Sequence, residues 1–406
     1  MKALLLEDHK APLVTLQVWY KVGSVDEPIG RTGMSHLLEH MMFKGTPKYG
    51  SKEFSAIVQR NGGMDNAYTT KEYTVYFQSI ASDRAGIPIE LESDRMSNLL
   101  LDPKEIVSER SVVMEERRMR YEDDPQNLLH EEVTAMAFSA HPYRWPVIGW
   151  MSDIASIERE QLYPYYKKYY SPDNAFIVIA GDITPDAALP LLEKNFGAVP
   201  RAAATPSEAP TKEPKQQGEK RLVMKKEAAE LPYILIAYHV PSFPHEDNYA
   251  LDVLSSVLSG GKSSRLYRDL VYEKRLALSA FTDYSSFYRD PFFFVLGATA
   301  APGKEIETVE KELYAEIRRI ADEPPTGREV QKAKNDIEAS FIFAQDSNYT
   351  KAQYAGIFEM MGGWRLMDTY LEGIKKVTPA EVQAVAKRYF SDDNKTVGIL
   401  LPLNKQ

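Results

Sequence analysis

A short pattern that occurs twice, 220 residues apart, limits most strongly what this chain can fold into. Residues 170–174 (YSPDN) precede the apolar segment 176–180, and residues 390–394 (FSDDN) precede the apolar segment 397–401. Each copy follows an amphipathic helical pattern that ends in basic and aromatic residues. An offset of this length predicts an ancient duplication of a whole domain rather than a short-period repeat. Chance similarity between two turn-and-strand signals is the alternative.

The segment between the two copies has the composition of a linker. Residues 200–220 read PRAAATPSEAPTKEPKQQGEK, which is rich in Pro, Ala, Lys and Glu and has no apolar periodicity. A chain of 406 residues is also too long for one ordinary core. We therefore predict an N-terminal domain at 1–200, a linker at 201–220, and a homologous C-terminal domain at 221–406.

Within the first half, strand and helix patterns alternate. Periodicity predicts strands at 14–22 and 74–80 and a helix at 33–44, and three long helices at 87–100, 103–121 and 125–138. The fold class expected is α/β (α+β): a two-layer sandwich in each half, with a mostly antiparallel sheet packed by helices, duplicated along the chain.

Composition and charge exclude several classes of function. The formal net charge is −9 and no long Lys/Arg block relieves it, so nucleic acid and anionic membranes are poor partners. No apolar run reaches the roughly 18 residues that span a bilayer. The chain has no cysteine, so any metal must be held by histidines and carboxylates.

The predicted helix at 33–44 contains a histidine pair. Residues 36–40 read His-Leu-Leu-Glu-His, and Thr32 or Ser35 is expected to cap the start of the helix. Residues four apart lie on one helical face, so His36 and His40 can direct their imidazoles at one ion.

Glu39 falls on the same face, three residues after His36, and is therefore placed to act on a water near that ion. The order H-x-x-E-H is the inverzincin signature. The alternative is two ordinary histidines that happen to lie near a glutamate. The pentad needs a third ligand.

The predicted helix at 103–121 supplies candidates for that ligand. Glu109 and Glu116 fall on the face that carries Ile106 and Val113, which should be buried. A buried carboxylate needs a positive partner. Zinc would provide one for Glu116, and the N–H of a ligand imidazole would provide one for Glu109, which would support that imidazole from behind. Ion pairs with arginines elsewhere are the alternative for both.

Glu115 is the rival to Glu116 as the third ligand, because it is the adjacent carboxylate in the sequence. It faces about 100° away from Glu116 on the helix.

These motifs resemble the pitrilysin/insulinase family of metallopeptidases, which includes the mitochondrial processing peptidase. The resemblance covers nearly the whole chain. It is carried by WYKVGSVDE at 19–27, GMSHLLEHMMFKGT at 33–46, NAYT at 66–69 and ERSVVMEE at 109–116, with the interval of 76 residues from His40 to Glu116 that is typical of the family.

The resemblance implies one Zn²⁺ per chain, with His36, His40 and Glu116 as ligands, Glu39 as catalytic base and Glu109 as support. The domain at 1–200 is thus expected to be the metal-binding peptidase domain, and the homologous domain at 221–406 to lack metal ligands. Zinc with three protein ligands keeps an open position and lowers the pKa of a water there. Glu39 would take the proton from that water and deliver it to the leaving amine.

The resemblance also implies a substrate-binding edge at Asn66, Ala67, Tyr68 and Thr69. Backbone pairing of an unfolded peptide with this edge would tolerate many sequences. An ordinary hairpin strand is the alternative.

In the family, two such halves close around a chamber, as one long chain or as two half-length subunits. This chain is of the half-length kind, so a dimer is implied. The family's Arg and Tyr, which help to hold substrate from the opposite half, would fall on Val271 and Leu278, and Arg268 and Arg275 do not restore the pair. We therefore expect a heterodimer whose partner supplies the pair.

Three readings of function follow from the resemblance. The first is a zinc metalloendopeptidase subunit, the second a non-catalytic structural subunit of the same fold, and the third a self-sufficient homodimeric peptidase. Similar bacterial subunits are exported, which favours the periplasm, whereas a native N-terminus as given would favour the cytoplasm.

Overall fold

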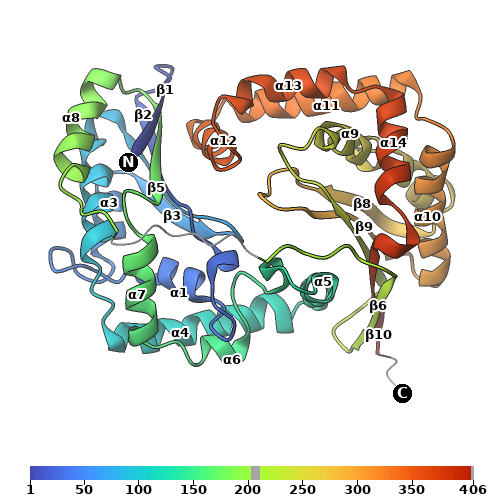
Figure 1. Ribbon diagram of the computed structural model, residues 1–406, viewed down its shortest axis with the longest axis horizontal. Coiled ribbons are helices and arrows are strands. Elements are labelled where there is room, and N and C mark those ends of the chain that lie inside the picture. The colour runs from blue at the N-terminus through green and yellow to red at the C-terminus, as the bar shows by residue number, and fades with distance from the viewer. Residues whose placement is uncertain (203–210, 404–406) are drawn as a thin grey trace. The chain divides into compact units, whose positions relative to one another are not determined.

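The computed structural model describes residues 1–202 and 211–403, so residues 203–210 of the predicted linker lie outside the described part. The described chain forms two compact units (Figure 1). Unit 1 comprises Met1–Arg118, His141–Thr211 and Ala344–Ile357, and unit 2 comprises Met119–Ala140, Lys212–Phe343 and Phe358–Gln406. Each unit therefore contains a segment from the other half of the sequence, which a single division at 201–220 does not describe.

Unit 1 is built on a five-stranded mixed sheet in the order β1-β5-β2-β4-β3. β1 runs parallel to β5, and the other neighbouring pairs are antiparallel. β5 is apolar and buried along its whole length because it lies inside the sheet, whereas β3 forms an edge. The strands are β1 (Lys2–Glu7), β2 (Leu13–Tyr20), β3 (Met64–Thr69), β4 (Thr74–Ala81) and β5 (Ala175–Gly181).

Unit 2 repeats this topology. Its sheet has the order β6-β10-β7-β9-β8, again with one parallel pair at the corresponding edge. The predicted duplicated α/β fold, with mostly antiparallel sheets, is thus confirmed. The strands are β6 (Lys220–Lys226), β7 (Tyr233–Val240), β8 (Ala277–Tyr284), β9 (Phe292–Ala300) and β10 (Lys395–Pro402).

The repeated sequence pattern makes the same hydrogen bonds in both units. The Asn174 side-chain amide donates to the carbonyls of Lys21 and Tyr169, at 3.3 and 3.0 Å. The Asn394 amide, 220 positions later, donates to His239 and Tyr389, at 2.8 and 2.7 Å. Each asparagine thus links the last residue of a helix to the backbone at the end of a strand. The helix is α7 (Arg159–Tyr169) in unit 1 and α14 (Pro379–Tyr389) in unit 2.

Helices cover both faces of the sheet in unit 1. Tyr76, on β4, contacts Phe43, just after α1, and Arg95 of α3, so these elements lie on one face. Gln17, one residue out of phase, donates to the carbonyl of Tyr349 at 3.1 Å, which places α12 on the opposite face. The helices named here are α1 (Met34–Met41), α3 (Gly86–Asn98) and α12 (Asn348–Met360).

In unit 2 a helix from the first half of the sequence covers one face of the sheet. A side chain at Gly398 would meet Val133 and Leu129 of α5 (Pro125–Ala137). Lys395, on the other face of the same strand, lies over the ring of Tyr314 in α10 (Ile306–Asp322). The two sheets therefore have equivalent cover, each partly supplied by the other half of the chain.

The three long helices predicted in the first half of the chain are present, and each begins within one residue of its predicted start. The region predicted as one helix at 103–121 is α4 (Pro103–Arg117) followed by one π-helical turn, Arg118–Glu122. Within the described residues no helix is both long and apolar enough to cross a membrane. The other α-helices are α2 (Glu53–Arg60), α6 (Met151–Ile154), α8 (Pro185–Phe196), α9 (Asp247–Ser259), α11 (Gly327–Ala344) and α13 (Leu366–Lys376).

Candidate metal centre

The start of α1 is capped by a carboxylate from an earlier loop. Neither Thr32 nor Ser35 caps the helix, so that prediction was wrong. The N-cap residue is Gly33, which has a φ of 91° and no side chain that could cap the helix. The carboxylate of Glu27 instead accepts hydrogen bonds from the backbone N–H groups of Gly33 and Ser35, at 2.8 and 2.7 Å. Burial raises the pKa of Glu27 to about 8. The cap fixes where α1 begins and hence where its histidines point.

The two histidines of α1 lie on one face, as their spacing predicts. Their ring centroids are 4.7 Å apart, His36 is buried and His40 is half-buried. α4 packs beside α1 and begins as predicted, with Asp102 accepting from the N–H of Lys104 at 2.8 Å and Pro103 in the first turn.

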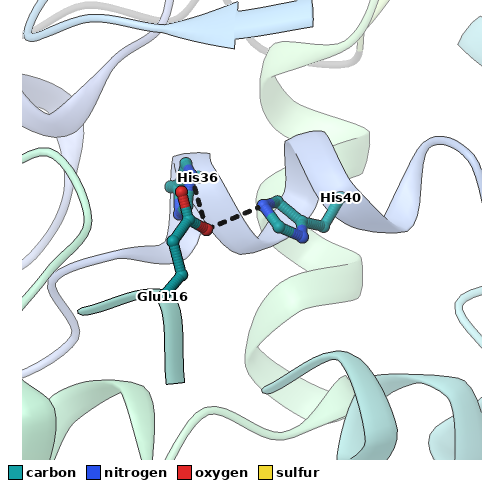
Figure 2. Close-up of side chains that lie close together, drawn as sticks. All are labelled: His36, His40 and Glu116. Carbon is teal, nitrogen blue, oxygen red and sulfur yellow. Dashed lines mark ion pairs between the residues drawn. The ribbon is translucent and has the colours of Figure 1, made fainter. Parts of the chain in front are cut away.

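Glu116, near the end of α4, completes a group of three donor side chains. Its Oε2 lies 3.8 Å from Nε2 of His36 and 3.5 Å from Nε2 of His40 (Figure 2). One ligand atom from each residue lies within 4.8 Å of the others. The structure thus brings together residues that are 80 positions apart in the sequence, from His36 to Glu116.

Glu109 lies behind His40, on the opposite side of the imidazole from Glu116. Its Oε1 is 2.9 Å from Nδ1 of His40, and its Oε2 contacts Nζ of Lys44. Burial acts to raise the pKa of Glu109, but the hydrogen bonds to His40 and Lys44 outweigh it and hold the pKa below its usual value. Sequence reasoning missed Lys44, although its position four residues after His40 was the available signal.

The pKa of His40 reflects the carboxylates around it. Burial acts to lower this pKa, but the hydrogen bonds to Glu109 and Glu116 outweigh burial and raise it to about 9. The rival ligand Glu115 is turned away from the group, with its side chain 62% exposed and paired with Arg118 at 2.8 Å.

Glu39 lies on α1 between the two histidines and contacts the sheet. The Thr69 hydroxyl donates to its Oε2 at 2.5 Å. Of the four residues predicted as a substrate edge, Tyr68 turns to the other face, where its hydroxyl lies 3.5 Å from Nε2 of Gln353. Asn66 accepts from the N–H of Ala67 at 2.8 Å.

The second half carries hydroxyl groups at the corresponding place. α9 packs on β8 as α1 packs on β3, and Ser255 and Ser259 of α9 lie 2.8 and 2.6 Å from the hydroxyl of Thr282 on β8. Among the residues that the structure describes, no group of metal-binding side chains forms there. Val271 belongs to the π-helical segment Tyr267–Glu273 and Leu278 to β8, where its side chain is 55% exposed.

The donor set suits zinc. Two imidazole nitrogens and one carboxylate are the ligand types of catalytic zinc sites, which keep a further position open. A ligand imidazole also needs a partner on its other nitrogen, and Glu109 provides this for His40. The residues present therefore fit a zinc ion.

The chain is similar to known proteins over nearly its whole length. Residues 2–149 match the family described as insulinase (peptidase family M16), and residues 156–337 match the peptidase M16 inactive domain. The zinc protease PqqE of Helicobacter pylori is 33% identical over 399 residues, which cover 97% of this chain and 89% of the relative. This chain belongs to the insulinase family.

Solved structures show how much of the M16 fold this family member contains. The crystal structure of a protease from Helicobacter pylori has a TM-score of 0.94 at 32% identity, covering 98% of this chain and 97% of the other. The periplasmic protease PqqL of Escherichia coli has a TM-score of 0.82 at 16% identity, and only 46% of that chain is matched. The protein is a half-length M16 member, as predicted.

Proposed function

We propose that this M16 protein is a zinc metalloendopeptidase subunit that hydrolyses unfolded peptides. The observation that carries the proposal is the meeting of His36, His40 and Glu116, with ligand atoms within 4.8 Å of one another. Relatives named zinc proteases support both the metal and the class of reaction.

In this proposal His36, His40 and Glu116 hold one zinc ion per chain, and Glu109 orients His40. When bound, zinc would act as a Lewis acid and lower the pKa of a water molecule. Glu39 accepts the proton of the attacking water and delivers it to the leaving amine. Its place on the same helix as both histidines keeps its carboxylate close to the reacting atoms.

The substrate edge is proposed for Asn66, Ala67, Tyr68 and Thr69. β3 pairs with β4 on one side and ends the sheet on the other, so its outer backbone groups can pair with an extended peptide. Backbone pairing would explain a broad choice of sequences, with specificity left to side-chain pockets.

A partner subunit is also part of the proposal. Val271 and Leu278 cannot help to hold the substrate and the oxyanion as an Arg and a Tyr would, so a homologous partner would supply that pair in a heterodimer. The PqqL chain, of which this chain matches 46%, supports the idea that two such lengths make one enzyme. The alternatives are a non-catalytic subunit and a self-sufficient homodimer.

One experiment separates these three readings. The purified protein is analysed for metal and assayed with a quenched peptide, alone and with a homologous subunit that carries the Arg/Tyr pair. Bound zinc and cleavage only in the mixture support the proposal. Cleavage by the chain alone supports the homodimer, and a metal-free protein that is inactive in both assays supports the structural subunit.

A further inference from the structure

The side chains of β3 divide between the two faces of the sheet. Thr69 pairs with Thr74, and Tyr68 pairs with Val75 one position further on, so the two neighbours point in opposite directions. Tyr68 faces α12, where it meets Gln353, and Thr69 faces α1, where it meets Glu39. Although Thr69 belongs to the proposed substrate edge, its side chain is thus directed at the base.

We infer that Thr69 is a positioning residue for Glu39, because its hydroxyl donates to one oxygen of that carboxylate and so restricts how the carboxylate can turn. The inference rests on the proposed function and adds a residue to it. The geometry that carries it is the 2.5 Å separation of Thr69 Oγ1 from Glu39 Oε2.

The chemistry of threonine suits this role. A hydroxyl has one hydrogen, so while it donates to Glu39 it cannot also donate to a substrate. A β-branched side chain has few rotamers. Thr69 also belongs to β3, which pairs with β4 along its whole length, so the position of its hydroxyl is well defined. A general base works best when other groups fix its orientation.

This arrangement links peptide binding to catalysis through one residue. The backbone of β3 is the proposed docking edge, and the Thr69 side chain at the end of that strand orients the base. The substrate role of Thr69 is therefore assigned to its backbone, and the role toward Glu39 to its side chain.

The test compares Thr69→Val, which keeps the shape of the side chain and removes the hydroxyl, with Thr69→Ser, which keeps the hydroxyl. We expect Thr69→Val to lower kcat of the zinc-loaded enzyme, assembled with its partner, by about 10-fold to 100-fold, since general bases contribute about 10²–10⁴-fold. KM and the zinc content should stay unchanged. Thr69→Ser should retain kcat within about threefold of the parent enzyme.

Thr15→Val is the matched control. Thr15 is a buried residue of β2 in the same sheet, and its hydroxyl lies 2.8 Å from that of Ser79, so the same substitution removes a hydrogen bond remote from Glu39. It should leave kcat and KM as they are. An equal loss of kcat in Thr15→Val would show a general effect on the sheet and would overturn the inference.

A binding assay separates positioning from substrate contact. Affinity for a fluorescent peptide is measured with the inactive Glu39→Gln variant, with and without Thr69→Val. Equal affinities support the inference, whereas weaker binding with Thr69→Val would assign the hydroxyl to the substrate and overturn it. Unchanged kcat in Thr69→Val would also overturn it, whereas failure of the parent enzyme to cleave any peptide would instead refute the proposed function.

Discussion

Nδ1 of His40 lies 2.9 Å from Oε1 of Glu109, so the imidazole turns its other nitrogen, Nε2, toward Glu116. This hydrogen bond decides which nitrogen is available to a metal, because the nitrogen that donates to Glu109 cannot also be a ligand. The site therefore depends on a residue outside the group of three donors.

Glu109→Gln should weaken zinc binding without abolishing it. The amide is less able than a carboxylate to accept from His40 and to pair with Lys44, and loss of such supporting groups typically costs about 10–100-fold in metal affinity. Competition with a zinc chelator measures the dissociation constant. Lys48→Met is a useful control, because Lys48 pairs with Glu90 at an exposed site. An unchanged constant in Glu109→Gln would contradict the assigned role.

Removal of Glu116 should affect the metal more directly. In Glu116→Gln the anionic ligand is lost, and we expect zinc to dissociate at chelator concentrations that the parent protein resists. Elemental analysis after dialysis checks this. Glu115→Gln is the matched control, since the side chain of Glu115 is 62% exposed and pairs with Arg118. Equal metal loss in both variants would argue against Glu116 as the ligand.

Glu39→Gln should retain zinc and lose turnover. The amide fills the same space but cannot accept a proton, so we expect kcat of the assembled enzyme to fall by at least about 10²-fold. Zinc content and peptide cleavage are measured on the same preparation. Full activity with bound zinc would show that another group is the base.

Zinc affinity should rise with pH. In the metal-free protein Glu109 and Glu116 raise the pKa of His40 to about 9, against the opposing effect of burial. Below that pH a proton occupies the imidazole and must leave before zinc binds, so the apparent dissociation constant should increase by about tenfold for each unit by which pH falls. Titration calorimetry in buffers of different ionisation enthalpy would count the released proton. Binding that is independent of pH between 6.5 and 8.5 would contradict this prediction.

Gly356 of α12 should be essential for the packing of unit 1. A Cβ atom there would lie 2.2 Å from two ring atoms of the fully buried Trp19. We expect Gly356→Ala to lower the free energy of unfolding by about 1–3 kcal/mol, even though alanine favours helix more than glycine does. Equilibrium unfolding in urea measures this change in the free energy of unfolding. Gly327→Ala in α11, where a Cβ would meet nothing within 4 Å, should not be destabilising.

Much of this architecture could be predicted from sequence because the signals were local. The repeated segments at 170–174 and 390–394 indicated the duplication, and spacing alone placed His36, His40 and Glu39 on one face. The cap of α1 could not be predicted, because Glu27 is separated from the helix by a loop whose path depends on tertiary contacts. The contact from Thr69 to Glu39 likewise depends on how β3 packs against α1.

Exchange of helices between the units was not predicted for the same reason. Nothing in the apolar pattern of α5 or α12 states which sheet the helix will cover. The sheet that each helix covers depends on the residues it packs against, such as Gly398 for α5 and Trp19 for α12.

The contribution of α12 to unit 1 has a consequence for biosynthesis. The five strands of the sheet that carries Trp19 all lie within the first 181 residues, yet α12, which packs on one face of that sheet, leaves the ribosome only after residue 357 has been added. The nascent protein therefore keeps the face that carries Trp19 without its α12 cover for nearly half of its translation.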